Sequence, residues 1–170
     1  LYSTGIAVNR LVPASLFRAR VFGVYRFRST SPRPLPDSVT ADACQTDADF
    51  DAVAAVTHFD DPDRSARTEA GSYSAFMLRR DDHVIGGVWA ATEYFDEHDL
   101  GLRIVLPTGA RWLFAAHLAK SHRGSGYYGG LLSRLLTSDP AATWYASINP
   151  TNRASMAAHR RAIDGEIGRV

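Results

Sequence analysis

Cysteine is nearly absent from this 170-residue sequence, which carries only Cys44, so no disulfide can form within the chain. No apolar run approaches the roughly 18 residues that a membrane-spanning helix requires. The six histidines and the cysteine never pair at the spacing of a zinc site. These absences argue against a disulfide-bonded scaffold, a helical membrane protein and a metal site, and they predict a cytoplasmic protein without a metal or a transmembrane segment.

Lysine is also scarce, because all but one of the 19 basic residues are arginine, a bias typical of a GC-rich genome. We expect a bacterial source. The net charge is +1, yet residues 1–36 contain six arginines and no acid. Seven aspartates lie between Asp42 and Asp63 with no Lys or Arg among them. A basic arm can bind nucleic acid or an anionic membrane surface. Because the aspartates offer a counter-charge within the chain, we expect a solvated arm and no nucleic-acid partner.

The length and the 45% content of hydrophobic residues suit one domain with its own core. We predict a basic extension over residues 1–36, with one strand at 21–28. Prolines at positions 32, 34 and 36 predict a linker or an extended crossing after that strand. The main domain is predicted over residues 37–170.

Hydrophobic patterning in the remainder predicts a mixed α/β fold and not a regular βαβ series. Thr46 is a predicted N-cap, because three aspartates follow it where the helix dipole favours acids. The predicted strands are 39–44, 72–80, 83–95, 102–106, 111–119 and 143–149. The predicted helices are 47–59, a short one within 60–71, 126–137 and 152–162.

The stretch HRGSGYYGG contains glycines at 124, 126 and 129, the G-x-G-x-x-G spacing of several phosphate-binding loops. A dinucleotide site also needs a carboxylate at the end of the next strand, where this chain has Ser-Ile-Asn at 147–149. A P-loop needs a Lys-Ser or Lys-Thr pair after the glycines, which is missing. The dinucleotide and P-loop hypotheses are therefore rejected.

A glycine turn between a strand and a helix nevertheless exposes main-chain N–H groups to an anion. Arg123 adds a positive charge at its mouth, and Gly124, Ser125 and Gly126 are small enough to let a diphosphate reach the main chain. The alternative is a tight turn whose glycines only permit packing of the helix on the strand.

The segment from Arg123 to Gly126 resembles the acetyl-CoA motif of the GCN5-related N-acetyltransferases, the GNAT superfamily. Downstream, NPTNRASMAAHRR is similar to the closing helix of that family, with Asn152, Ser155 and His159 at the matching positions. The resemblance spans roughly residues 38–170. Two departures are Tyr128, where the family has Gly or Ala, and the end of the chain at Val170, where a final strand would run.

The resemblance implies a central, mixed and mostly antiparallel sheet flanked by helices, with acetyl-CoA as co-substrate. It also implies that Leu118 and Ala119 offer main-chain bonds to the thioester and pantetheine. The residues that it predicts to bind CoA are Leu118, Ala119, Arg123, Gly124, Ser125, Gly126, Tyr127, Tyr128, Asn149, Asn152 and Ser155.

Three residues are candidates for acid–base chemistry, although the strand at 111–119 carries no acidic residue. His159 holds the family's position for the acid near the sulfur. His117 is either a base facing the acceptor or a packed histidine. Glu93 is either a base acting through water or an exposed carboxylate at a strand edge.

We therefore predict an acyl-CoA-dependent N-acyltransferase that transfers an acetyl group to an amine by direct attack. The alternative is a GNAT-like module of little or no activity that binds CoA or a protein partner. The expected acceptor is a small-molecule or peptide amine bound by residues 58–72 and 93–109. Assembly as a homodimer is left open.

Overall fold

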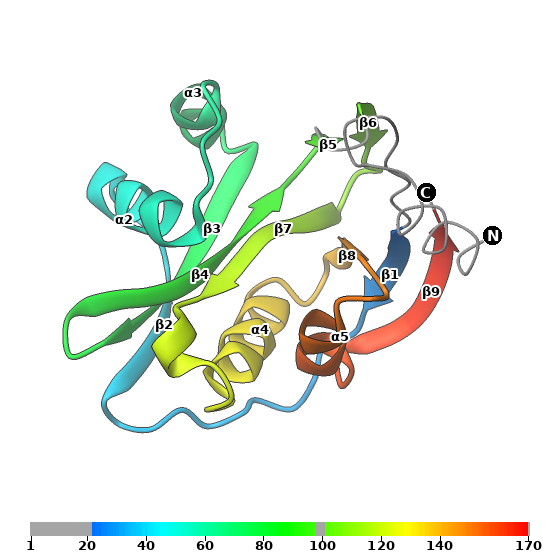
Figure 1. The fold of residues 1–170 in the computed structure, drawn as a ribbon. Helices are drawn as coiled ribbons and strands as arrows, with labels where there is room; N and C mark the ends of the chain where they lie inside the picture. Colours follow the sequence, from blue (N-terminus) through cyan, green and yellow to red (C-terminus); the bar gives the residue numbers. More distant parts are fainter. Residues whose placement is uncertain (1–21, 98–100, 170) are drawn as a thin grey trace, which may run out of the picture.

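The computed structural model describes residues 22–97 and 101–169 (Figure 1). The strands are β1 (Gly23–Phe27), β2 (Val39–Ala43), β3 (Tyr73–Arg80), β4 (His83–Ala91), β5 (Tyr94–Glu97), β6 (Leu102–Val105), β7 (Ala110–Leu118), β8 (Thr143–Ile148) and β9 (Ile163–Arg169). The helices are α2 (Asp47–Thr57), α3 (Arg64–Glu69), α4 (Tyr127–Ser138) and α5 (Arg153–His159), with a 3-10 turn, η1 (Lys120–His122), before α4.

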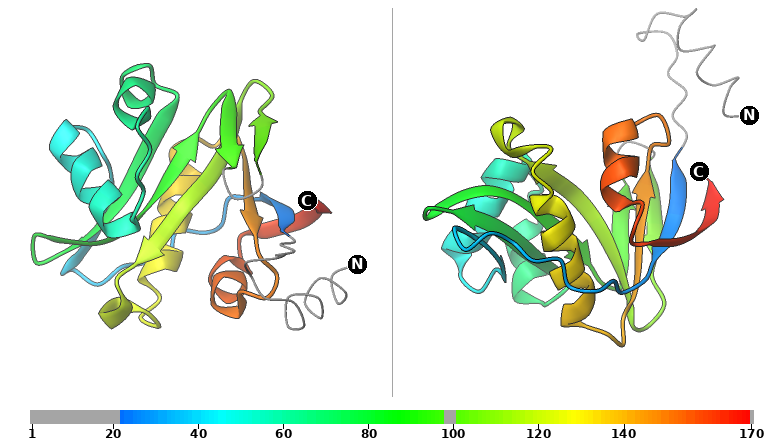
Figure 2. Two further views of the ribbon diagram at one scale, coloured as in Figure 1. Left: turned by 45° about the horizontal axis from the view of Figure 1, so that its top comes forward. Right: turned by 90° about the horizontal axis from the view of Figure 1, so that it is seen from below.

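Seven strands form one sheet in the order β2-β3-β4-β7-β8-β1-β9, and β5 pairs with β6 in a separate hairpin. The β7–β8 pair is parallel, and the other pairs of the large sheet are antiparallel. Helices α2 and α3 cover one face and α4 and α5 the other (Figures 1 and 2). This confirms the predicted mixed class, with a mostly antiparallel sheet flanked by helices.

Each face of the sheet has its own hydrophobic core, because alternate residues of a strand point to opposite faces. Val88 packs with the leucines of α4, whereas its neighbour Trp89 packs with Val53 of α2. Leu78 and Met77 of β3 are divided between the two cores in the same way. The central strands are therefore apolar throughout, which explains why they lack the alternation typical of a half-exposed strand.

The starts of the two longest helices follow different chemistry. Thr46 caps α2 by accepting a bond from the Asp49 N–H, and the Asp49 side chain accepts from the Thr46 N–H in return. The predicted N-cap is thus confirmed. Helix α4 has Gly126 as its N-cap instead, with a φ of 84° in the left-handed region. Glycine has no side chain that could accept a bond from the first helical amides. The amides of the first turn of α4 therefore have no N-cap side chain to bond.

The predicted boundary at residue 36 does not separate two packing units within the described residues. β1 lies inside the large sheet, where Gly23–Phe27 pair with β8 on one side and β9 on the other. Tyr25 and Phe27 belong to the core under α4 and α5. Residues 1–21 of the predicted extension lie outside the described part of the chain.

The final strand that the sequence was expected to lack is present as β9. It follows α5 directly, because Arg160 ends the helix and Ala162 turns the chain by donating its N–H to the His159 carbonyl. The sequence concealed this strand because two glycines and mostly exposed side chains give it no hydrophobic pattern.

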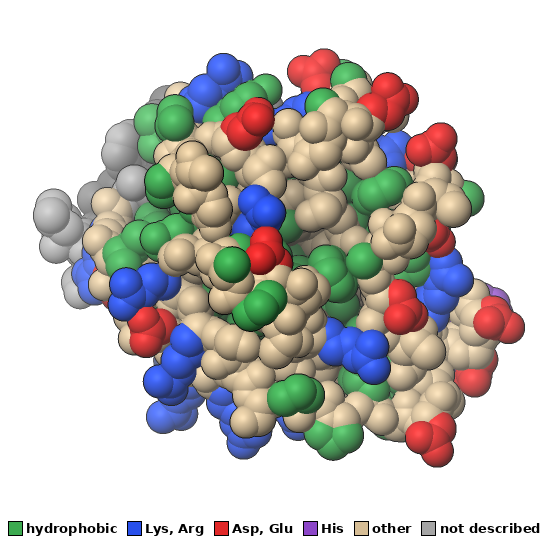
Figure 3. Space-filling view, turned by 180° about the vertical axis from the view of Figure 1, so that it is seen from behind, with side chains coloured by type: hydrophobic (Ala, Val, Ile, Leu, Met, Phe, Trp, Pro, Cys, Tyr) green, Lys and Arg blue, Asp and Glu red, His purple; other side chains and the backbone are tan. Residues whose placement is uncertain are grey.

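The charges divide between two sides of the molecule, as seen from behind in Figure 3. Acidic side chains gather mostly at the edge that carries α2, and arginines are more numerous on the opposite side. Two of the predicted counter-charges pair within the domain, since Asp49 bonds Arg79 and Asp51 bonds Arg64. Among the described residues, no helix combines the length and apolar character needed to cross a membrane.

Candidate functional site

Strands β7 and β8 separate halfway along the sheet. Their parallel pairing covers only Ala110–Leu113 against Thr143–Ala146, so residues 114–118 of β7 have no partner strand on that side among the residues that the structure describes. Figure 1 shows the two strands diverging toward α4 and α5. A strand without a neighbour presents main-chain N–H and C=O groups to any extended ligand.

A bulge lies in β7 at the same level. Gly87 of β4 faces His117 and Trp89 faces Phe114, which leaves Val88 opposite both Ala115 and Ala116. Ala115 has a φ of 45°, an uncommon conformation for a residue with a side chain. The bulge turns main-chain groups out of the ladder where the two strands part.

The glycine turn places the amino end of α4 beside this opening. Gly124 and Gly126 both have positive φ, at 79° and 84°. The Tyr127 N–H reaches the Ser125 hydroxyl only at 3.4 Å, and Gly130 is the first residue bonded back along the helix, to the Gly126 carbonyl. The amides between them lie at the positive end of the helix, which is favourable for an anion.

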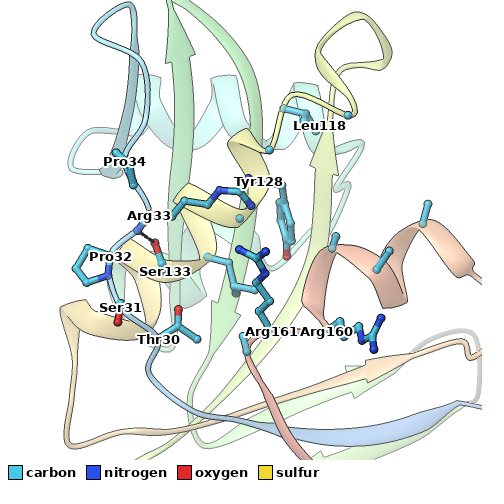
Figure 4. A pocket seen from close by; sticks show the side chains of 18 residues that line it. Thr30, Ser31, Pro32, Arg33, Pro34, Leu118, Tyr128, Ser133, Arg160 and Arg161 are labelled. Carbon is cyan, nitrogen blue, oxygen red and sulfur yellow. Dashed lines mark hydrogen bonds between the residues drawn. The ribbon is translucent and has the colours of Figure 1, made fainter.

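A cavity of about 940 Å³ opens over this turn, between α4 and α5 (Figure 4). Three of its lining residues are arginines, Arg33, Arg160 and Arg161, and no carboxylate lies among the lining residues. The remaining lining residues are Thr30, Ser31, Pro32, Pro34, Leu118, Gly124, Gly126, Tyr128, Gly129, Leu132, Ser133, Ala154, Ala157, Ala158 and Ala162. A large cavity with several positive charges and no negative one suits a polyanionic ligand.

Arg33 is the arginine that covers the glycines, and no sequence motif pointed to it. Its guanidinium lies 2.7 Å from the point where a Cβ at Gly126 would stand, and 3.0 Å from the same point at Gly129. The only sequence signal was an arginine between prolines, in a segment predicted to be a linker or a crossing. The structure makes that segment a wall of the cavity.

Arg123, predicted to supply charge at the mouth of the turn, is used differently. Its Nε donates to the Leu118 carbonyl at 2.9 Å, and one Nη lies 3.5 Å from Nε2 of His117. The Ala119 N–H donates to the Ile85 carbonyl. Three groups predicted to face CoA thus form hydrogen bonds within the protein: the Arg123 guanidinium, the Leu118 carbonyl and the Ala119 N–H. Arg123 stabilises the end of β7.

Tyr128, the residue found in place of the family's Gly or Ala, lines the cavity and turns its hydroxyl to His159. His159 Nδ1 lies 2.8 Å from the Ser155 carbonyl, to which only a protonated nitrogen can donate. Nε2 is then the acceptor for the Tyr128 hydroxyl at 2.8 Å. Burial lowers the pKa of His159, against a smaller raising effect of the Ser155 carbonyl. A neutral ring with both nitrogens bonded is not poised to protonate a thiolate, so the predicted acid role is not supported.

Two asparagines and a serine of the predicted CoA set serve the turn before α5. Asn149 accepts the Thr151 N–H at 2.9 Å and the Thr151 hydroxyl at 2.6 Å. Asn152 caps the helix by accepting the Ser155 N–H at 3.0 Å, one of the two roles foreseen for it. Of the residues predicted to bind CoA, those that line the cavity are Leu118, Gly124, Gly126 and Tyr128.

His117 and Glu93 lie at different ends of the sheet. His117 is half-buried beside Arg123, and its ring meets that of His58 at the end of α2, with centroids 5.1 Å apart. Burial lowers the pKa of His117, and Arg123 and His58 lower it further. Glu93 is exposed in the turn after β4, close to the start of β7, with a long bond from Ser72. His117 therefore lies at the end of β7 beside Arg123, and Glu93 lies at the opposite end of the sheet.

The buried His159 predicts a measurable pH dependence of stability. Because its pKa lies below the ordinary value of 6.5 in the folded protein, the unfolded chain binds the extra proton first as the pH falls. The contribution of neutral His159 is complete above pH 6.5 and declines below it, until the folded pKa is reached. We expect the free energy of unfolding to fall between pH 7 and pH 5 more steeply in the wild type than in His159→Asn, measured by urea titration.

The exposed His83 provides the control for this experiment, because His83→Asn removes an exposed histidine and leaves the buried His159 in place. Its stability should follow the same pH dependence as the wild type. Equal slopes for the wild type and His159→Asn would contradict the assignment of a neutral buried ring.

Known structures provide the comparison for this arrangement. No protein-family model matches the sequence, and no curated protein matches it. A GCN5-related N-acetyltransferase from Kribbella flavida aligns over 91% of this chain with a TM-score of 0.61 and 13% identity. An aminoglycoside acetyltransferase from an uncultured soil metagenomic sample, solved with sisomicin, aligns over 74% with a TM-score of 0.54 and 8% identity, and the alignment covers 87% of that protein.

A predicted acetyltransferase from Clostridium acetobutylicum, solved with acetyl-CoA, aligns over 72% of this chain and 87% of its own, with a TM-score of 0.50 and 10% identity. The chain spans only 57% of the length of the Kribbella protein. At these identities the comparisons concern the fold. Three features of the structure accompany these alignments: the divided β7–β8 pair, the glycine turn and the flanking helices. Together they show that the chain has the fold of the GCN5-related N-acetyltransferases.

Proposed function

We propose that this chain is an acyl-CoA-dependent N-acyltransferase, with acetyl-CoA as the donor and an amine as the acceptor. The observation that carries the proposal is the cavity at the glycine turn, where amides of the helix start, Arg33 and Arg161 face a space without a carboxylate (Figure 4). The diphosphate of CoA supplies the negative charge that such a space favours. Its pantetheine arm is an amide chain, which suits the free edge of β7.

Direct transfer needs few protein groups. The amine nitrogen attacks the thioester carbon, a C–N bond forms, the C–S bond breaks and CoA leaves as a thiolate. The developing oxyanion needs an N–H donor, and the Ala115–Ala116 bulge provides main-chain amides outside the ladder. The amine gives up one proton, which His117 accepts directly or through a water molecule, and the thiolate takes one from solvent.

His117 suits the role of base because burial, Arg123 and His58 lower its pKa and keep the ring neutral at pH 7. It lies on the α2 side of the sheet, opposite the core that includes Phe27, whose ring His159 contacts. An acceptor amine would therefore approach from α2, while the donor lies over α4. A small-molecule or peptide amine is the proposed acceptor class.

The second candidate is a module that binds CoA without transferring the acyl group. It is favoured by the engagement of His159 with Tyr128 and Ser155, because this leaves no acid poised for the sulfur. The two candidates agree on CoA binding and differ only in turnover.

Ligand-dependent melting tests the shared claim. At a CoA concentration of about 100 times the dissociation constant, binding should add roughly 2.7 kcal/mol to stability and raise the melting temperature by several degrees. ATP at the same concentration is the control for a general anion effect. Release of free thiol from acetyl-CoA with a panel of amines then separates transferase from binding module, and a melting temperature unmoved by CoA would refute both.

A further inference from the structure

The segment from Thr30 to Pro36, here called the strap, is fastened to α4 at points around Arg33. The Arg33 N–H donates to the Ser133 hydroxyl at 3.1 Å, and that hydroxyl donates to the Gly130 carbonyl. Leu35 packs on the core so closely that a Cβ at Gly130 would stand 2.5 Å from its Cδ2. Prolines on both sides of Arg33 and Leu35 fix an extended backbone, so alternate residues face α4. The strap therefore holds the Arg33 side chain at one defined position, over the amino end of α4.

That place is electrostatically unfavourable for a cation by itself. The guanidinium lies against Gly126 and Gly129, at the positive end of α4, so N–H donors of Arg33 face the same space as N–H donors of the helix. Neither set can accept a hydrogen bond from the other. An anion between them satisfies both sets.

A second arginine approaches from the opposite wall. Figure 4 shows Arg161, from the turn between α5 and β9, directed into the cavity toward Arg33 and Tyr128, whereas Arg160 points away. Across the described parts of the chain, neither Arg33 nor Arg161 forms an ion pair with a carboxylate. Two guanidinium groups that share one cavity repel each other unless a multiply charged anion lies between them.

We propose that Arg33 and Arg161 form a clamp that holds the diphosphate of CoA against the glycine turn, and that the clamp makes the enzyme select CoA thioesters over thioesters of pantetheine alone. The proposal rests on the proposed function, since it concerns the same donor. It adds a determinant from the start of the chain, outside the glycine motif. A guanidinium pairs with two phosphate oxygens at once, which gives the clamp geometric as well as electrostatic selectivity.

Calorimetric titration of the full 170-residue chain with CoA, dephospho-CoA and pantetheine tests the clamp. In Arg33→Ala the affinity for CoA and for dephospho-CoA should fall about 10- to 100-fold, since both carry the diphosphate. The affinity for pantetheine should stay unchanged. Arg161→Ala should act in the same direction.

Arg134→Ala is the matched control, because Arg134 is an exposed arginine of α4 that does not line the cavity. It should weaken CoA binding by less than about fivefold. Melting curves of all three variants without ligand check that the fold persists, which is expected because Arg33 and Arg161 are exposed.

Three outcomes would overturn the clamp. A loss in Arg33→Ala no larger than in Arg134→Ala would leave CoA binding, and with it the proposed function, in place without the clamp. Tighter CoA binding by Arg33→Ala would mean that Arg33 blocks the diphosphate site. A wild-type chain that binds no CoA would refute the clamp and the proposed function together.

Discussion

Replacing Trp89 by alanine is expected to lower the free energy of unfolding by about 3–5 kcal/mol, because the cavity left behind adds to the lost burial. Trp89 is fully buried at the centre of the core beneath α2. Phe50, Phe59, Tyr73 and Phe114 surround it, with ring centroids 5.0–6.4 Å away. A loss of this size is a large share of the 5–15 kcal/mol typical of a whole domain.

The indole also makes a hydrogen bond that phenylalanine cannot replace. Nε1 donates to the Thr57 hydroxyl at 3.1 Å, and that hydroxyl donates to the Val53 carbonyl at 2.7 Å. Trp89→Phe should therefore cost about 1–3 kcal/mol, less than the alanine variant. The exposed Val105 gives a control, and Val105→Ala should change stability by less than about 0.5 kcal/mol. Urea titration measures all three, and a Trp89→Ala loss below that of Trp89→Phe would contradict this account of the core.

Replacing His117 by alanine is expected to reduce kcat about 100-fold or more, if His117 is the base of an N-acyltransferase. The KM for acetyl-CoA should change little, because His117 does not line the cavity over the glycine turn. In the wild type, kcat/KM should rise with pH along a limb below 6.5, because burial, Arg123 and His58 lower the pKa of His117. The limb reflects loss of the proton from the ring, and His117→Ala should abolish it.

His83→Ala is the matched control, since His83 is an exposed histidine at the first residue of β4, four residues before Gly87, the pairing partner of His117. It should retain both the rate and the pH profile. If His117→Ala keeps kcat within about threefold of the wild type, the amine needs no protein base and the role is wrong. Steady-state kinetics with a fixed amine acceptor over pH 5–9 provide both readouts.

Local chemistry explains which elements the sequence predicted well. Thr46 followed by Asp49 is a capping signal that depends on four consecutive residues, and the cap formed as expected. Strands β3 and β4 are apolar runs joined by the tight Asp81–Asp82 turn, where both residues have positive φ. The glycine turn before α4 was also recognisable, because its glycines are close together in sequence.

Long-range pairing explains what was missed. The position of β1 depends on strands β8 and β9, which lie more than a hundred residues away, so no local pattern at residues 23–27 could reveal it. Arg33 has the same difficulty, because its importance comes from a segment crossing α4 and not from its neighbours in sequence. For the site, sequence predicted the glycine turn and Tyr128 as cavity residues but not the two arginines of the clamp.

The antiparallel seam in which Gly23 lies opposite Arg169 has a kinetic consequence. Every other strand pair of the large sheet except β1–β8 joins segments from within residues 39–148, so that part can assemble from contacts of shorter range. Pairing of β1 with β9 requires closure of a very long loop, and contacts of such long range form slowly during folding. The β1–β9 seam should therefore close last when the chain refolds and open first when it unfolds, so hydrogen exchange at its amides would outpace exchange in β3 and β4.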